Sequence, residues 1–202
     1  MRPGLFVPTL AFLLAMSTPA QQAPKISAEG GGIDDRASAR VLYWNGTTNA
    51  AAGQFAIDYG RPVWKKQYDD PATFDKMTEG KVWRMGSNFW TLLDTCLPLK
   101  IGGRSVEPGY YFLGVHRSAD GASWSLAFID PTAVRAAHLD AFQIQKAAIL
   151  FEAPLTMSKA ALKAQKLTIK MAYPKEDFTH VTMKLDWGNV ELTAPIEVQL
   201  PK

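Results

Sequence analysis

The sequence predicts an all-β protein, an antiparallel β-sandwich of jelly-roll type with one or two short helices. About nine or ten short runs rich in aromatic and β-branched residues follow one another, and glycine or proline turns separate them. Much of the last third alternates between apolar and polar residues, as strands with one buried face do. A closed β-barrel with a ligand cavity is the alternative architecture.

Residues 1–20 have the features of a secretory signal peptide. Arg2 supplies a positive start, residues 5–16 are mostly apolar, and Thr18-Pro19-Ala20 offers the small residues that a signal peptidase reads. The apolar run is shorter than a transmembrane helix requires. We therefore expect cleavage, no stable membrane span in the mature chain, and a secreted or periplasmic location.

The remainder of the chain is expected to form a lead-in followed by one domain. Residues 21–37 contain Gly30-Gly31-Gly32 and few large apolar side chains, which predicts a flexible segment. Residues 38–202 are numerous enough to bury a sizeable core as a single domain.

The elements of this domain begin with strands at residues 40–44 and 54–59, the second of which ends before Pro62. Helix starts are expected at Asp70-Pro71 and Asp130-Pro131, where an acidic N-cap precedes a proline at the first helical position. One or two helical turns are expected at residues 158–164.

The run at residues 88–97, NFWTLLDTCL, predicts an interior strand. Phe89 and Leu93 fall on one face and Trp90 and Leu92 on the other, so both faces are apolar and should be covered. Cys96 is the sole cysteine, which excludes an internal disulfide. We expect its side chain to be buried as a small apolar group.

Two hairpins are predicted from turn residues. Gly102-Gly103 separates the runs at 99–101 and 104–106, a hairpin signal. Gly188-Asn189 separates two alternating runs, 181–187 and 190–198, and a two-residue turn there would place both apolar rows on one face.

Three segments carry a family resemblance. IDYGRPVW at residues 57–64, KVWRMGSN at 81–88 and KIGGRSVEPGYYFL at 100–113 resemble the pattern of the DUF2911 proteins, a family of undetermined function. The resemblance extends from about residue 54 to 200. Family members often have Glu directly after the Asn, where this chain has Phe89. The resemblance implies the fold and a bacterial envelope setting, and it implies no activity.

No strong catalytic or metal-binding motif is present. The sequence contains no HExxH, paired CxxC, GxSxG or P-loop pattern, and its three histidines (116, 138 and 180) lack metal-ligand spacing. We therefore predict no metal and no cofactor. The net charge of +3, without a basic cluster, gives no indication of nucleic acid as a partner.

Five residues near the glycine-rich turns are the predicted ligand-binding residues: Arg84, Arg61, Asn88, Trp83 and His116. A half-buried arginine needs acceptors, so each arginine either forms a structural ion pair or holds an anionic ligand. The asparagine either caps a turn or bonds a ligand. The tryptophan either packs in the core or stacks on a sugar.

Three functions are compatible with these residues. The first is non-catalytic binding of a small molecule or glycan. The second is an envelope hydrolase or isomerase that uses Asp94 and His116, with Asp94 beside Trp90 and Leu92, an apolar setting that would raise its pKa if enclosed. The third is a structural or assembly protein of the cell envelope, marked by an exposed apolar patch or sheet edge. The oligomeric state and the ligand stay open.

Overall fold

The computed structural model describes residues 26–201. The predicted signal peptide and residues 21–25 lie outside the described residues. Residues 33 to 202 form a compact unit by themselves, of which residues 33–201 are described. No helix in that part is both long enough and apolar enough to cross a membrane.

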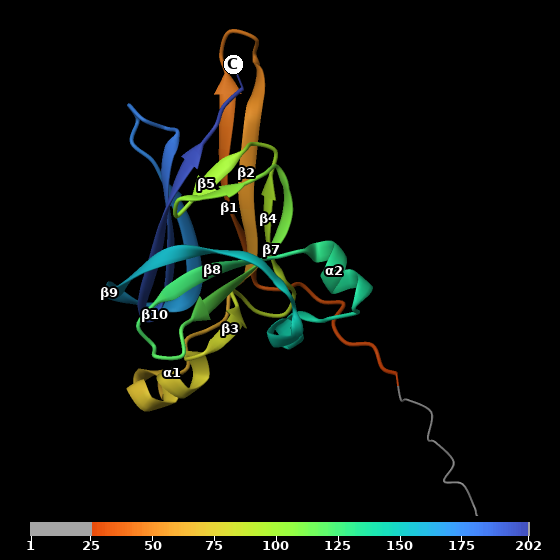
Figure 1. The fold of residues 1–202 in the computed structure, drawn as a ribbon, viewed down its shortest axis with the longest axis vertical. Helices are drawn as coiled ribbons and strands as arrows, with labels where there is room; N and C mark the ends of the chain where they lie inside the picture. Colours follow the sequence, from red (N-terminus) through yellow and green to blue (C-terminus); the bar gives the residue numbers. More distant parts are fainter. Residues whose placement is uncertain (1–25, 202) are drawn as a thin grey trace, which may run out of the picture. The chain divides into compact units, whose positions relative to one another are not determined.

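Short helices interrupt a chain of antiparallel strands (Figure 1). Their order is β1 (Arg36–Asn45), β2 (Ala50–Gly60), η1 (Lys66–Asp69), α1 (Pro71–Thr78), β3 (Lys81–Arg84), β4 (Thr91–Thr95), β5 (Leu99–Ile101), β6 (Arg104–Val106), β7 (Gly109–Arg117), β8 (Trp124–Ile129), α2 (Pro131–Ala136), η2 (Ala141–Lys146), β9 (Ile149–Ala172) and β10 (His180–Val198), where η marks a 3-10 helix.

Within the described residues, the strands form one sheet in the order β1-β2-β4-β7-β8-β9-β10-β5-β6, with β3 beside β7. Every pair of strands is antiparallel. The outer strands β1 and β6 do not pair with each other, so the sheet is not closed into a barrel. The prediction of an antiparallel all-β fold with short helices is confirmed, and the barrel alternative is wrong.

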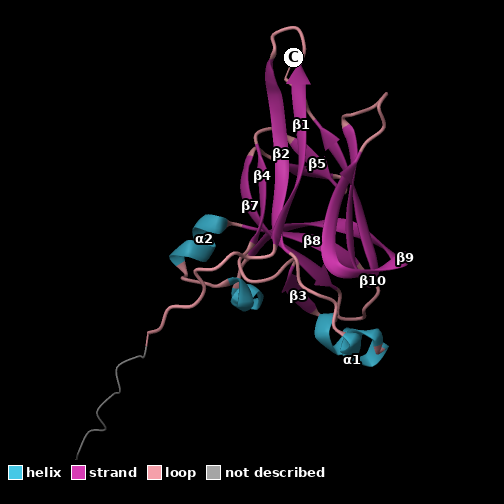
Figure 2. Cartoon of the chain, turned by 180° about the vertical axis from the view of Figure 1, so that it is seen from behind, coloured by secondary structure: helices cyan, strands magenta, loops and turns pink. Residues whose placement is uncertain are grey.

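The long strand β9 lets a single sheet enclose a core (Figure 2). Its first part pairs with β8 up to Leu155, and the part from Thr156 onward pairs with β10. The two halves of the sheet therefore share one apolar core. Phe55, Leu93 and Leu126 enter this core from the first half, and Leu185, Leu192 and Ile196 enter it from the second.

The predicted hairpin at Gly188-Asn189 is wrong, because residues 180–198 form one strand that pairs with β9. The register shifts on both sides of Gly188, which is a β-bulge. The bulge changes which alternate residues face the core, so Trp187 and Val190 are both buried. A bulge and a two-residue turn leave the same phase change in the sequence, and the pairing with β9 selects the bulge.

A second correction concerns residues 158–164, where a helical turn was expected. Ser158 and its neighbours belong to β9, because each residue from Thr156 to Lys159 has a partner on β10. The predicted starts of α1 and α2 are confirmed. The Asp70 carboxylate accepts from the N–H of Thr73 at 2.9 Å, and the Asp130 carboxylate accepts from the N–H of Thr132 at 2.7 Å.

The central strand β4 is covered on both faces, as predicted. The predicted place of Phe89 beside Leu93 is wrong, because Phe89 precedes β4, is 58% exposed and lies with its ring 6.4 Å from that of Phe112. Leu93 faces the main core. On the outer face of the sheet, Trp90 and Leu92 form a second apolar cluster with Phe112 and Val134, and α2 and η2 pack against the sheet through this cluster. The Gly102-Gly103 hairpin is also confirmed.

The expectation for Cys96 is wrong, because this residue is exposed. It follows the last residue of β4, where its neighbour Leu97 turns into the core instead. Its Sγ lies 3.1 Å from the backbone N and 3.2 Å from the backbone O of Gln54.

Candidate functional site

Arg84 ties two segments of the outer face together. Its Cζ lies 3.6 Å from the centroid of the Phe142 ring in η2, and its Nη1 donates to the carbonyl of Asn88 at 3.2 Å. Among the described residues it forms no ion pair. Partial burial lowers the pKa of the guanidinium, and the nearby Asp140 carboxylate opposes this shift. Its contacts are those of a side chain that fixes η2 and the loop before β4.

Asn88 and Arg61 contact the two residues that precede β1, Asp34 and Asp35. The Nδ2 of Asn88 donates to Oδ1 of Asp34 at 2.8 Å. The backbone N–H of Arg61 donates to the carbonyl of Asp35 at 2.9 Å, and its Nη1 lies 3.9 Å from the Asp35 carboxylate. Arg61 and Asn88 therefore contact one segment, Asp34-Asp35, Arg84 is linked to that segment through Asn88, and each of the three has a protein partner.

Trp83 lies on the other face of β3 from Arg84, because successive side chains of a strand alternate. Its ring packs 5.4 Å from the ring of Trp187 in the main core. The buried Nε1 of Trp83 has no hydrogen-bond partner in the described part of the chain. The structure therefore separates Trp83 from the arginines with which it was grouped.

His116 belongs to a polar cluster that spans three strands. Its Nδ1 lies 2.8 Å from Oε1 of Glu152 on β9, and the hydroxyl of Ser125 on β8 donates to Oε2 of the same carboxylate at 2.6 Å. All three side chains are on the outer face, and the carboxylate holds the imidazole in one orientation. Sequence reasoning missed Glu152, which is 36 residues from His116 and was marked by no motif.

The pair Asp94 and His116 does not assemble. Both residues are on the outer face, but Asp94 is opposite Tyr110 at one end of β7 and His116 is near the other end, about 20 Å away along the strand. Asp94 is exposed rather than enclosed. No group of three or more His, Cys, Asp or Glu in the described ranges could hold a metal ion.

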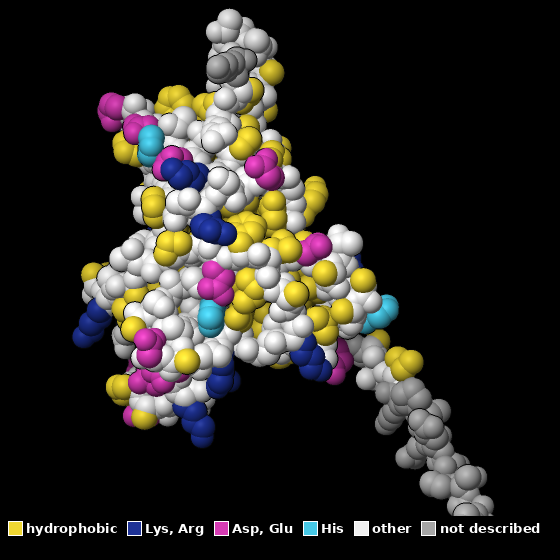
Figure 3. All heavy atoms as spheres, in the orientation of Figure 1, with side chains coloured by type: hydrophobic (Ala, Val, Ile, Leu, Met, Phe, Trp, Pro, Cys, Tyr) yellow, Lys and Arg dark blue, Asp and Glu magenta, His cyan; other side chains and the backbone are white. Residues whose placement is uncertain are grey.

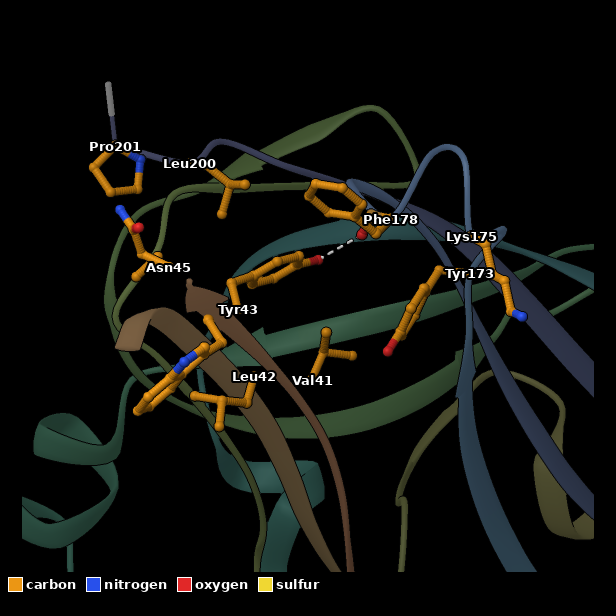
Figure 4. Close-up of a pocket in the computed structure, with 11 residues that line it drawn as sticks. Val41, Leu42, Tyr43, Asn45, Tyr173, Lys175, Phe178, Leu200 and Pro201 are labelled. Carbon is orange, nitrogen blue, oxygen red and sulfur yellow. Dashed lines mark hydrogen bonds between the residues drawn. The ribbon is translucent and has the colours of Figure 1, made fainter. Parts of the chain in front are cut away.

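Two hollows can be compared as ligand sites. The hollow beside Arg84 measures about 190 Å³ and lies between β3 and η2. A larger cavity of about 500 Å³ opens between the end of β1, the loop after β9 and the C-terminal tail (Figure 4). Its lining residues share no segment with the predicted site: Val41, Leu42, Tyr43, Trp44, Asn45, Ala52, Tyr173, Lys175, Phe178, Leu200 and Pro201.

The wall of the larger cavity is fixed by Tyr43. Only 6% of this residue is exposed, and its hydroxyl donates to the carbonyl of Phe178 at 2.9 Å. Burial raises the pKa of the Tyr43 phenol to about 12, with a further contribution from Tyr173. The phenol therefore stays neutral and keeps this hydrogen bond at ordinary pH.

Three other aromatic side chains border the cavity with much of their surface free, and one of them is Trp44, which is 57% exposed. Tyr173 is 50% exposed and Phe178 is 47% exposed. Figure 4 shows the hydroxyl of Tyr173 directed across the cavity toward Val41 on β1. The site thus combines a rigid inner wall with aromatic surface that no protein group covers.

The model of the DUF2911 family, described as a protein of unknown function, matches residues 45–196. The chain belongs to the DUF2911 family. The predicted membership is therefore confirmed. No curated protein and no solved structure matches the chain.

In this DUF2911 protein the cavity draws on residues inside and outside the matched range. Tyr173 and Phe178 lie within residues 45–196, whereas Tyr43 and Leu200 lie beyond its two ends. The family motifs around Arg61, Arg84 and Asn88 therefore gave no signal for this site. Tyr43 and Phe178 are 135 residues apart, and only the folding of β1 against the loop after β9 brings them together.

Proposed function

We propose that this DUF2911 protein is a non-catalytic binding protein that holds a small molecule in the cavity between β1 and the loop after β9. The observation that carries the proposal is the free aromatic surface of Tyr173 and Phe178 around a hollow of about 500 Å³. Ligand sites in proteins commonly have volumes of about 300–1,000 Å³ and a mostly apolar lining.

This uncovered aromatic surface can stabilise a bound ligand. A ligand that removes apolar area from water gains about 2.5 kcal/mol for every 100 Å² covered. The Tyr43 hydroxyl donates to the backbone carbonyl of Phe178, so the loop after β9 is held against β1 before a ligand binds. A wall that is formed before binding lowers the ordering cost of association.

The smaller hollow beside Arg84 supports binding less well. Arg84 already stacks on Phe142 and bonds Asn88, and Asn88 bonds Asp34. A ligand there would have to displace contacts that hold loops in place. In the larger cavity, the exposed surfaces of Tyr173 and Phe178 can contact a ligand without the loss of such contacts.

Binding of N-phenyl-1-naphthylamine, an uncharged dye that fluoresces in apolar sites, tests the proposal. We expect saturable binding with one site per chain. Ala52→Leu adds bulk to the lining and should weaken binding at least tenfold. Ala51→Leu is the matched control, because Ala51 neighbours Ala52, is exposed and does not line the cavity. Equal binding by both variants, or none by the unchanged protein, would overturn the assignment.

We also propose that the mature protein is secreted or periplasmic, on the strength of the charged, apolar and small-residue pattern in residues 1–20. Expression of the full chain in a bacterial host should yield a protein whose intact mass lacks about the first 20 residues, recovered outside the cytoplasm. An uncleaved chain in the cytoplasmic fraction would contradict this localisation.

A further inference from the structure

We infer that the ligand of this cavity is an amphipathic anion, with a flat apolar body and a single carboxylate or sulfonate group. The inference rests on the proposed function and narrows it, since a neutral glycan and an apolar molecule are the other occupants of such a site. Three features of the lining support it: its charge, its depth and its free hydrogen-bonding groups.

The lining has one sign of charge. Lys175 lines the cavity, and no Asp or Glu does. Lys175 forms no ion pair within the described part of the chain. Two acids follow it in the loop, but Asp177 is held by His180, whose Nδ1 lies 2.7 Å from its Oδ1, and Glu176 does not line the cavity. An anionic ligand is therefore the complement of this lining.

The interior of the cavity is apolar, and its one charged side chain lies at the mouth. Val41 and Tyr43 form the deep wall and are nearly fully buried. The ammonium group of Lys175 lies at the rim and points away from these side chains (Figure 4). A charge in the interior would lose its hydration without a partner. The ligand's anionic group therefore stays at the mouth while its apolar body enters.

The hydrogen-bonding groups disfavour a neutral sugar. Sugar hydroxyls need several donors and acceptors at once. No carboxylate lines this cavity to accept from them, and Oδ1 of its Asn45 already accepts from the N–H groups of Thr47 and Thr48. The Tyr43 hydroxyl is already committed to the carbonyl of Phe178. The hydroxyl of Tyr173 donates to no group in the described chain, so it is free to meet one acceptor oxygen of the ligand.

A pair of dyes with the same aromatic body tests the inference. 8-Anilinonaphthalene-1-sulfonate carries one anionic group, and N-phenyl-1-naphthylamine carries none. At low salt the sulfonate dye should bind at least threefold more tightly than the uncharged dye, the size expected of one ion pair at an exposed rim. Lys175→Glu should weaken the sulfonate dye about tenfold and change the uncharged dye less than twofold.

Lys146→Glu is the control for a general change of net charge, because Lys146 is exposed and does not line the cavity. It should leave both dyes unaffected. If the uncharged dye binds and Lys175→Glu does not weaken the sulfonate dye, the anionic assignment is overturned and the cavity remains a ligand site. If neither dye binds, or Ala52→Leu has no effect on either, the proposed function itself is overturned.

Discussion

Two groups of aromatic residues in this protein differ in how far neighbouring residues cover their rings. The first, here called the α1 aromatic cluster, consists of Trp64, Tyr68, Phe74, Trp83 and Trp187. The second comprises Tyr43, Trp44, Tyr173 and Phe178 around the cavity. The α1 aromatic cluster is closed: the rings of Trp64 and Trp187 lie 5.0 Å apart at 79°, and these residues are only 6% and 7% exposed.

Two of the three indole N–H groups in the α1 aromatic cluster are paired, and the third, that of Trp83, has no partner among the described residues. In the α1 aromatic cluster the indole N–H of Trp64 donates to Asp69 at 2.9 Å and that of Trp187 donates to the carbonyl of Pro62 at 3.0 Å. At the cavity, the Tyr173 hydroxyl donates to no described group. Aromatic residues that complete a core and aromatic residues that border the cavity are thus distinguished by how their neighbours cover them, and residue type does not separate the two groups.

The surface adds a further contrast with the cavity. On the face drawn in Figure 3, acidic and basic side chains are interspersed, so neither sign of charge dominates. The lining of the cavity, in comparison, has a lysine and no acid. A local excess of one charge is informative where the rest of the surface is mixed.

The largest expected effect concerns the closed cluster. An added Cβ at Gly188, whose φ is +59°, would lie 2.0 Å from the Trp64 ring. Gly188→Ala should lower the free energy of unfolding by about 3 kcal/mol or more, through overpacking and left-handed backbone strain together. Urea denaturation measures this loss. Gly103→Ala is the matched control, because Gly103 has a φ of +83° and open space around it, and should cost about 1 kcal/mol. Similar losses for the two variants would refute the steric role of Trp64.

The next effect concerns the contact between β2 and β9, two strands that are not neighbours in the sheet. The buried hydroxyl of Tyr59 accepts from the N–H of Ile169 at 2.9 Å and lies 3.3 Å from its carbonyl oxygen. It therefore satisfies backbone groups on the edge of β9. Tyr59→Phe should cost about 2 kcal/mol in unfolding free energy because a buried N–H loses its acceptor. A loss below that of Tyr43→Phe at neutral pH would contradict this ranking.

A smaller effect is expected at Tyr43, with a pH signature. Tyr43→Phe should cost about 1 kcal/mol at neutral pH, where a partly buried hydrogen bond is lost. The folded pKa of about 12 exceeds the ordinary value of 10.0, so the folded state holds this proton more tightly. This contribution is complete below pH 10 and is lost as the pH rises through 12. The difference in unfolding free energy between the two proteins should therefore shrink above pH 10, and a constant difference would show that Tyr43 does not titrate in this way.

The smallest effect is expected at Arg84, and its substitution tests which of the two hollows binds the ligand. Arg84→Ala removes the stacking on Phe142 and should cost about 0.5 kcal/mol. It should not change binding of N-phenyl-1-naphthylamine in the larger cavity. A large loss of dye binding, with stability maintained, would move the ligand site from the cavity to the outer face.

Much of the fold follows from local rules that the sequence carries by itself. Asp70 and Asp130 precede prolines and cap α1 and α2. Gly102-Gly103 makes a tight hairpin, since both residues adopt positive φ. The two apolar faces of β4 require cover on both sides. Each of these features depends on residues only a few positions apart, so the sequence determines them before any distant contact forms.

The features that depend on residues far apart in the chain were determined only by the tertiary structure. The phase change at Gly188 is a bulge because β9 pairs across it and the Trp64 ring packs against it, and both partners are remote in the chain. The cavity likewise joins the end of β1 to the loop after β9. Alternation specifies which face of a strand is apolar, and it does not specify which other strand covers that face or leaves it open. That choice arises from the packing of the whole sheet, and in this protein it determines where the candidate ligand site lies.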